Sequence, residues 1–164
     1  MKIENNKKEI NFEKTKEKFI NFLESKDNAI MVLATSFKNR VIARNVLIAN
    51  DGLDIYFFTW GHSRKCEQIK NNPKVAFCKD KVQIEGTAKI LGDLFSQKNK
   101  KYTDIIRNKF PEAIKRWEQK PGMVIVRIKP NFICVDGNVI GDNLYLEYLD
   151  IENKKAYREK WAYY

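Results

Sequence analysis

A charged side chain interrupts an otherwise apolar stretch of the chain at Arg44. The residues on either side, 41–43 and 46–48, are all apolar. An arginine in such a stretch is costly unless its charge is paired. A carboxylate such as Glu85 is one possible partner, because buried charges are usually paired. The alternative is an anionic ligand, which the planar guanidinium can hold through two hydrogen bonds.

A second group of polar residues follows the aromatic run 56–60. Gly61 permits a sharp turn there, and Ser63 is a typical cap for a helix that begins beside it. The first N–H groups of a helix are unpaired and carry partial positive charge, which favours a phosphate. Thr59, Arg64 and Lys65 add a hydroxyl and two cations. The residues fit either an ordinary serine cap followed by exposed basic residues or a phosphate site.

The two groups meet if the segments that carry them are neighbours in a sheet. Residues 29–36, 41–50 and 53–59 are predicted to be three consecutive antiparallel strands. Asp51-Gly52 is a strong turn signal between the last two, because both residues tolerate positive φ. We therefore expect Arg44 and the start of the following helix to converge on one phosphate.

The remaining elements predict a mainly β protein, a β-barrel with helices. Helices are predicted over residues 12–25, 63–72 and 94–118, with Pro111 placed where a second helix can start. Further strands are predicted at 75–79, 82–91, 123–129 and 132–135, whereas the tail from Asn143 alternates only weakly. The length of 164 residues predicts one domain over residues 1–164. This pattern is typical of a small antiparallel barrel.

Composition narrows the class of protein. No apolar run approaches the length of about 20 residues that a membrane-spanning helix needs, and residues 1–9 do not resemble a secretory leader. Three cysteines without a CxxC spacing and a single histidine, His62, predict no metal site, no disulfide framework and a cytoplasmic location. The formal charge is +10, but the lysines are scattered, so a nucleic-acid partner is not favoured.

Five short motifs, taken in order, resemble a known family. It is the FMN-binding split-barrel family that includes pyridoxamine 5′-phosphate oxidase, and the similarity covers about residues 12–130. The motifs are Arg44-Asn45-Val46-Leu47, Phe58-Thr59, Ser63-Arg64-Lys65, Asn72-Pro73-Lys74-Val75-Ala76 and Ile84-Glu85-Gly86.

The resemblance implies a six-stranded antiparallel split barrel that forms a homodimer, with FMN bound at the subunit interface. The implied phosphate-binding residues are Arg44, Thr59, Ser63, Arg64 and Lys65. The backbone of Asn45, Val46 and Leu47 would line one edge of the isoalloxazine, and Phe58 would lie beside the ribityl chain. A phosphomonoester carries about −1.5 to −2 charges at neutral pH, which suits three cations and two hydroxyls.

Some positions depart from the oxidase itself. Ala49 stands where the oxidase has a substrate-binding lysine, Lys81 replaces a flavin-contacting glutamine, and Trp161 lacks the Arg-x-His segment that follows the oxidase's tryptophan. The resemblance is closer to the small, nitroimidazole-reductase-like members. The aromatic tail, with Tyr157, Trp161, Tyr163 and Tyr164, is compatible either with packing on a partner subunit or with covering the flavin.

The function these features imply is that of an FMN-dependent oxidoreductase. Electrons would pass from NAD(P)H through FMN to a small organic acceptor, and no side chain is singled out as a catalytic acid or base. Two alternatives remain: a flavin carrier without enzymatic activity, and a basic barrel that binds nucleic acid through aromatic and cationic side chains.

Overall fold

A computed structural model of the protein describes residues 7–118 and 120–161. Ten strands form one antiparallel sheet in the order β1-β10-β9-β8-β7-β6-β2-β3, with β5 paired to β8 and β4 to β5. The strands are β1 (Lys7–Ile10), β2 (Ile30–Phe37), β3 (Arg40–Leu47), β4 (Ala49–Asp51), β5 (Asp54–Trp60), β6 (Lys74–Lys79), β7 (Val82–Asp93), β8 (Met123–Ile140), β9 (Asn143–Asp150) and β10 (Lys155–Lys160).

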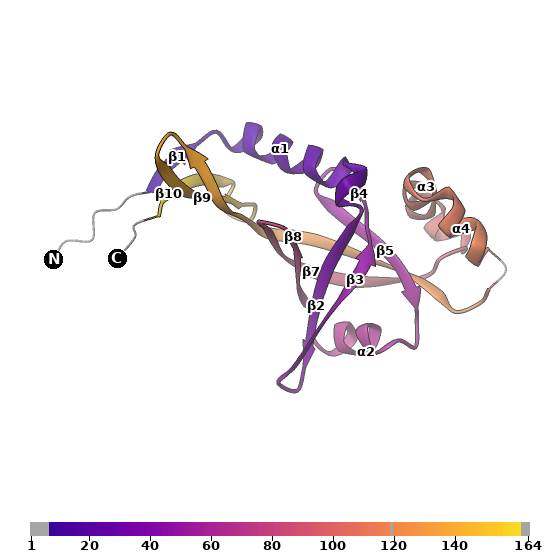
Figure 1. The fold of residues 1–164 in the computed structure, drawn as a ribbon. Coiled ribbons are helices and arrows are strands. Elements are labelled where there is room, and N and C mark those ends of the chain that lie inside the picture. Colours follow the sequence, from indigo (N-terminus) through magenta and orange to yellow (C-terminus); the bar gives the residue numbers. More distant parts are fainter. Residues whose placement is uncertain (1–6, 119, 162–164) are drawn as a thin grey trace.

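Four α-helices surround the sheet (Figure 1). They are α1 (Phe12–Glu24), α2 (Arg64–Asn71), α3 (Lys100–Lys109) and α4 (Pro111–Trp117), with short 3-10 turns at Lys26–Asn28 and Gln97–Asn99. Asn11 caps α1 by accepting a hydrogen bond from the backbone N–H of Lys14, and α1 buries Phe19 and Leu23 against the sheet. The helix predicted over 94–118 is confirmed only from residue 100 onward, and there as two helices, because the chain breaks at Phe110 and Pro111 occupies the first position of α4.

The strands curl around a core but do not close into a barrel by hydrogen bonding. Within the described residues, β3 pairs with β2 alone, so the far edge of β3 is free. The hairpin between β2 and β3 turns at Lys38 and Asn39, both with positive φ. The core side chains come from α1, α2 and seven of the strands, among them Leu33, Phe57, Phe77, Ile84, Val126 and Ile133.

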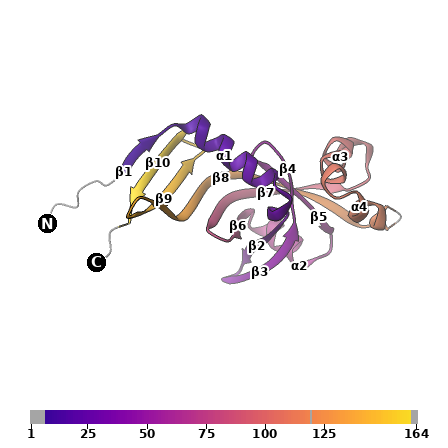
Figure 2. The ribbon, with the colours of Figure 1, turned by 45° about the horizontal axis from the view of Figure 1, so that its top comes forward.

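The terminal part of the chain differs from the sequence-based prediction. Residues 123–129 and 132–135 belong to one strand, β8, which runs through Pro130 to Ile140. The partner on one edge of β8 changes at this proline, from β5, which pairs through Ile128, to β9, which pairs from Phe132 onward. The proline therefore costs no ladder bond on that edge. β9, β10 and β1 extend the sheet as an arm (Figure 2), which makes ten strands instead of the six implied by the resemblance.

No helix in the described ranges is both long enough and apolar enough to cross a membrane.

Candidate functional site

Arg44 projects from β3 toward α2 and the neighbouring strand β2. Its Nη1 donates to the hydroxyl of Thr35 at 2.6 Å and to the carbonyl oxygen of Leu33 at 3.3 Å. Its Nη2 donates to Oε1 of Gln68 on α2 at 3.3 Å. All three acceptors are neutral, and no carboxylate within the described residues forms a salt bridge with Arg44. The suggested pairing with Glu85 is therefore wrong, and the charge of Arg44 remains uncompensated.

The junction between β5 and α2 brings the other predicted phosphate ligands to the same place. β5 ends at Trp60, and Gly61 turns the chain while its N–H donates to the carbonyl oxygen of Gly122 at 2.8 Å. Lys65, in the first turn of α2, donates from Nζ to the Thr59 hydroxyl at 2.9 Å. The cation and the hydroxyl are thus already in contact with each other.

Ser63 occupies the predicted cap position of α2, but it does not behave as an ordinary cap. Its backbone is extended, with φ −69° and ψ 151°, and its side chain makes no capping hydrogen bond. The Ser63 hydroxyl oxygen is buried and has no hydrogen-bond partner among the described residues. A buried polar atom without a partner is costly, so this hydroxyl is suited to a ligand atom that the chain itself does not supply.

Arg44 lies close enough to Arg64 and to Lys65 for their charges to interact. Burial lowers the pKa of the Arg44 guanidinium, and the charge of Arg64 lowers it further. Burial likewise lowers the pKa of Lys65, followed by the effect of Arg44; the Cys66 thiol acts weakly in the opposite direction. Repulsion between like charges disfavours the charged forms, and an anion bound among them would relieve it.

The residues expected around the flavin ring do not all lie together: Asn45, Val46 and Leu47 are on β3, whereas Phe58 is on β5. Asn45 and Leu47 are exposed and Val46 is half-buried, all three on the strand with the free edge. Phe58 packs into a second hydrophobic cluster with α3 and α4. Successive side chains of a strand point to opposite faces, so the Phe58 ring lies on the side of β5 away from Thr59.

Sequence reasoning missed two residues that contact Arg44, namely Thr35 and Gln68. Thr35 lies in an apolar run, where a β-branched residue reads as an ordinary strand former. Gln68 lies on the face of α2 that also buries Cys66 and Ile69. A polar residue on the buried face of a helix was the signal that could have drawn attention to it.

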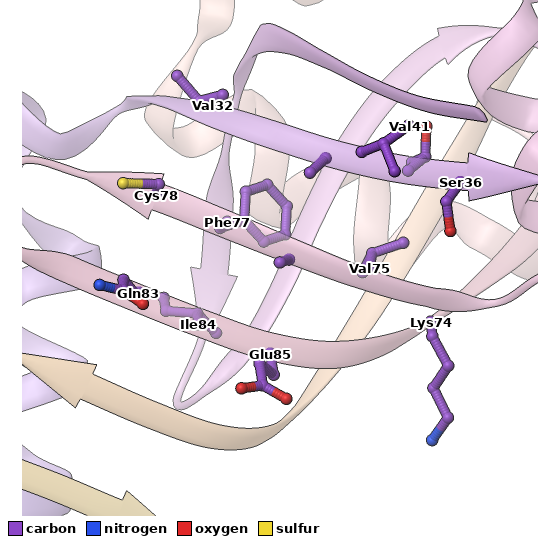
Figure 3. Close-up of a pocket in the computed structure, with 13 residues that line it drawn as sticks. Val32, Ser36, Val41, Lys74, Val75, Phe77, Cys78, Gln83, Ile84 and Glu85 are labelled. Atoms are coloured by element: carbon purple, nitrogen blue, oxygen red, sulfur yellow. The ribbon is translucent and has the colours of Figure 1, made fainter. Parts of the chain in front are cut away.

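The outward face of β3, β2, β6 and β7 is apolar and partly exposed. A hollow of about 600 Å³ lies over it, and Figure 3 shows Val32 and Val41 on one side of the hollow and Gln83 and Glu85 on the other. Val32 and Ala34 alternate along β2 with Leu33 and Thr35, so this face is opposite the one where Arg44 makes its contacts.

Comparison with known proteins identifies the family of the chain. The family model for pyridoxamine 5′-phosphate oxidase matches residues 15–133 of the chain. The chain belongs to the pyridoxamine 5′-phosphate oxidase family. Within that family it is not the oxidase itself. Ala49, at the position of the oxidase's substrate-binding lysine, is buried in β4, and Lys81 donates to the carbonyl oxygen of Gly137 at 2.9 Å.

Solved structures of other proteins share the fold of this family member. General Stress Protein 26 from Bacillus anthracis is 23% identical with a TM-score of 0.60, over 84% of this chain and 98% of that one. An FAD-binding protein from Mesorhizobium loti is 16% identical with a TM-score of 0.55, over 70% and 89%. The heme storage protein HutZ from Vibrio cholerae is 15% identical with a TM-score of 0.60, over 78% and 96%. No match was found among curated proteins.

Proposed function

We propose that this family member is an FMN-dependent oxidoreductase whose cofactor phosphate is held at the start of α2. The observation that carries the proposal is the Ser63 hydroxyl, which is buried and has no hydrogen-bond partner in the described part of the chain. It precedes Arg64 and Lys65 on α2, and the charge of Arg44 interacts with both of these cations. A dianionic phosphate supplies both the missing acceptor for that hydroxyl and the missing negative charge. The Mesorhizobium loti relative, whose printed name gives it FAD, is consistent with a flavin ligand.

The flavin ring would lie along the free edge of β3. The backbone N–H and C=O groups of Asn45 and Leu47 point to this edge, since Ile48 and Val46 belong to the alternating set that bonds the neighbouring strand. Such unpaired groups suit the polar edge of an isoalloxazine. When bound, FMN would supply the two-electron redox chemistry between NAD(P)H and a small organic acceptor. The chain's own residues would bind and orient the reactants, since no acid or base has been singled out among them.

We further propose that the protein is a homodimer with its flavin sites at the subunit interface. The exposed apolar residues Ile30, Val32, Val41 and Leu47 lie on one face of the neighbouring strands β2 and β3, and contiguous exposed apolar side chains are typical of interfaces. A second copy of the chain would cover this face, and with it the ring end of the cofactor. We also propose a cytoplasmic location, which the three free cysteines fit. The single-domain organisation of residues 1–164 likewise remains a proposal.

The test begins with the protein as purified from cells. The cofactor is released by heat and identified by mass, and the expected ligand is FMN. The oxidation of NADH and NADPH is then measured with quinones, nitroaromatic compounds and haem as acceptors. Turnover with one of them supports an oxidoreductase. Bound FMN without any reaction would instead indicate a flavin carrier. Absorbance typical of nucleic acid, with salt-sensitive binding to oligonucleotides, would contradict the proposal.

A further inference from the structure

Gln68 is a polar side chain that α2 buries almost completely, leaving 4% of the residue exposed. Its Oε1 accepts hydrogen bonds from the Thr35 hydroxyl at 2.6 Å and from Nη2 of Arg44 at 3.3 Å. Its Nε2 donates to the backbone carbonyl oxygen of Arg40 at 3.3 Å. One amide thus connects α2 to strands β2 and β3, and two of its three bonds concern the guanidinium of the proposed phosphate site or its direct partner.

The directions of these bonds follow from the chemistry of the donors. An arginine side chain can only donate, so the Thr35 hydroxyl must accept from Nη1 of Arg44. The Thr35 proton is then free to be given to Oε1 of Gln68. That choice orients the amide, with its oxygen toward Thr35 and its nitrogen toward the carbonyl of Arg40. Thr35 is 1% exposed, so water does not compete for these positions.

A glutamate at position 68 would also accept from Thr35 and Arg44 and would add an ion pair, although it would lose the bond to the Arg40 carbonyl, as Gln68→Met does too. The chain instead has the neutral amide, which holds the guanidinium without cancelling its charge. We infer that Gln68, acting with Thr35, is a positioning residue that aims Arg44 at the ligand phosphate while leaving its positive charge uncompensated. This inference rests on the function proposed above and deepens it, because it names what makes the site selective for an anion.

The test compares FMN with riboflavin, which has the same ring and lacks the phosphate. Dissociation constants of both are measured by flavin fluorescence for the wild-type protein, Gln68→Glu and Gln68→Met. Gln97→Glu serves as the matched control, because Gln97 is exposed in the 3-10 turn before α3 and the substitution changes the net charge equally.

Gln68→Glu should weaken FMN binding by about 10-fold or more. An opposite charge beside an ionised group changes its equilibria by a factor of about ten or more, and here the added carboxylate would compete with the phosphate for Arg44. Riboflavin binding should change by less than about 3-fold, because riboflavin has no phosphate that interacts with the charge of Arg44. Gln68→Met, which loosens Arg44 without pairing it, should fall between wild type and Gln68→Glu for FMN. Gln97→Glu should match wild type for both ligands.

Two results would overturn the inference. One is FMN binding by Gln68→Glu that equals wild type. The other is an equal loss of FMN and riboflavin in both Gln68 variants, which would assign Gln68 a purely structural role. These results differ from a failure of the proposed function, in which the wild-type protein itself would bind FMN no better than riboflavin; that outcome overturns the inference as well.

Discussion

At the scale of single residues, Arg44 and Lys65 can be removed separately. In the proposed site each would make charge-assisted hydrogen bonds to the bound phosphate, and such bonds contribute about 1.5–3 kcal/mol. Arg44→Ala and Lys65→Ala should therefore each weaken FMN binding by roughly 10- to 100-fold and change riboflavin binding much less. Lys70→Ala is the control, because it removes an equal charge from an exposed position on the same helix. Equal losses for both flavins would mean that the two residues act through folding.

The lowered pKa of Lys65 gives the phosphate site a pH dependence. A bound phosphate favours the charged lysine and raises its pKa again, so binding above the lowered pKa requires proton uptake. The affinity for FMN should consequently fall as the pH rises from about 7 toward about 10, the range below the ordinary lysine pKa. The affinity for FMN is divided by the affinity for riboflavin at each pH, because the two ligands share the flavin ring and the effect of its ionisation then cancels. The ratio should decline in wild type and decline less in Lys65→Met; identical curves would contradict the assignment.

The sequence predicts that Arg44 and the Ser63–Lys65 junction share one site, and this remains a prediction. The expected pairing of strands 41–50 and 53–59 is wrong for the part that carries Arg44: the chain breaks at Ile48 into β3 and β4, and only the short β4 pairs with β5. Two local patterns can be recognised in the sequence alone: a charge within an apolar strand, and hydroxyl groups just before a helix. Thr35 and Gln68 lack such signals, because their roles arise from contacts between segments far apart in the chain. Nor does any local pattern reveal that the Ser63 hydroxyl is buried without forming its cap bond.

At the scale of elements, Gly86 explains why the Ile84-Glu85-Gly86 motif ends in glycine. Gly86 lies at a bulge where β7 pairs with β8 opposite Pro130. A Cβ added there would be 2.7 Å from the backbone oxygen of Lys129 and 2.8 Å from a methyl group of Ile128. At such distances the backbone of Lys129 would have to move, which costs more free energy than the rotation of a side chain.

Gly86→Ala should therefore lower the free energy of unfolding by about 1–3 kcal/mol, as overpacking of a core usually does. The comparison is Gly61→Ala, where the nearest atom is a side-chain methyl of Val124 at 3.0 Å, which can move. Urea unfolding measures both variants. An equal or larger cost for Gly61→Ala would show that the close approach at Gly86 is not the limiting feature.

Strands and helices could be predicted from the sequence where the periodicity of apolar residues was strong, and the prediction failed where that periodicity was weak. The alternation of β7 and the apolar run of β2 identified those strands. β8 was divided because proline usually ends a strand, and only the change of pairing partner at Pro130 makes it acceptable there. In β9 the buried Glu147 interrupts the apolar pattern, and in β10 Lys155, Arg158, Glu159 and Lys160 leave too few apolar residues for the alternation to be recognised. Tyr163 and Tyr164 of the aromatic tail lie outside the described residues.

At the scale of the whole molecule, the proposed dimer makes binding of the cofactor depend on assembly. Val32→Lys places a charge in the apolar face of β2, where Val32 is 38% exposed. Burying that charge between two copies is costly, so the variant should shift toward monomer in sedimentation experiments and bind FMN more weakly. Val139→Lys is the control, because Val139 is 68% exposed at the end of β8 and lies outside this face. Val32→Lys that remains dimeric and binds FMN normally would contradict the interface.

The central claim is that one strand arginine and the beginning of α2 hold the same phosphate. A crystal structure of the protein with FMN tests it most directly. We expect the phosphate oxygens within hydrogen-bond distance of the Arg44 guanidinium, the Lys65 ammonium and the Ser63 hydroxyl, with the ring along the edge of β3. A phosphate bound elsewhere, with the Ser63 hydroxyl still unpartnered, would contradict the account.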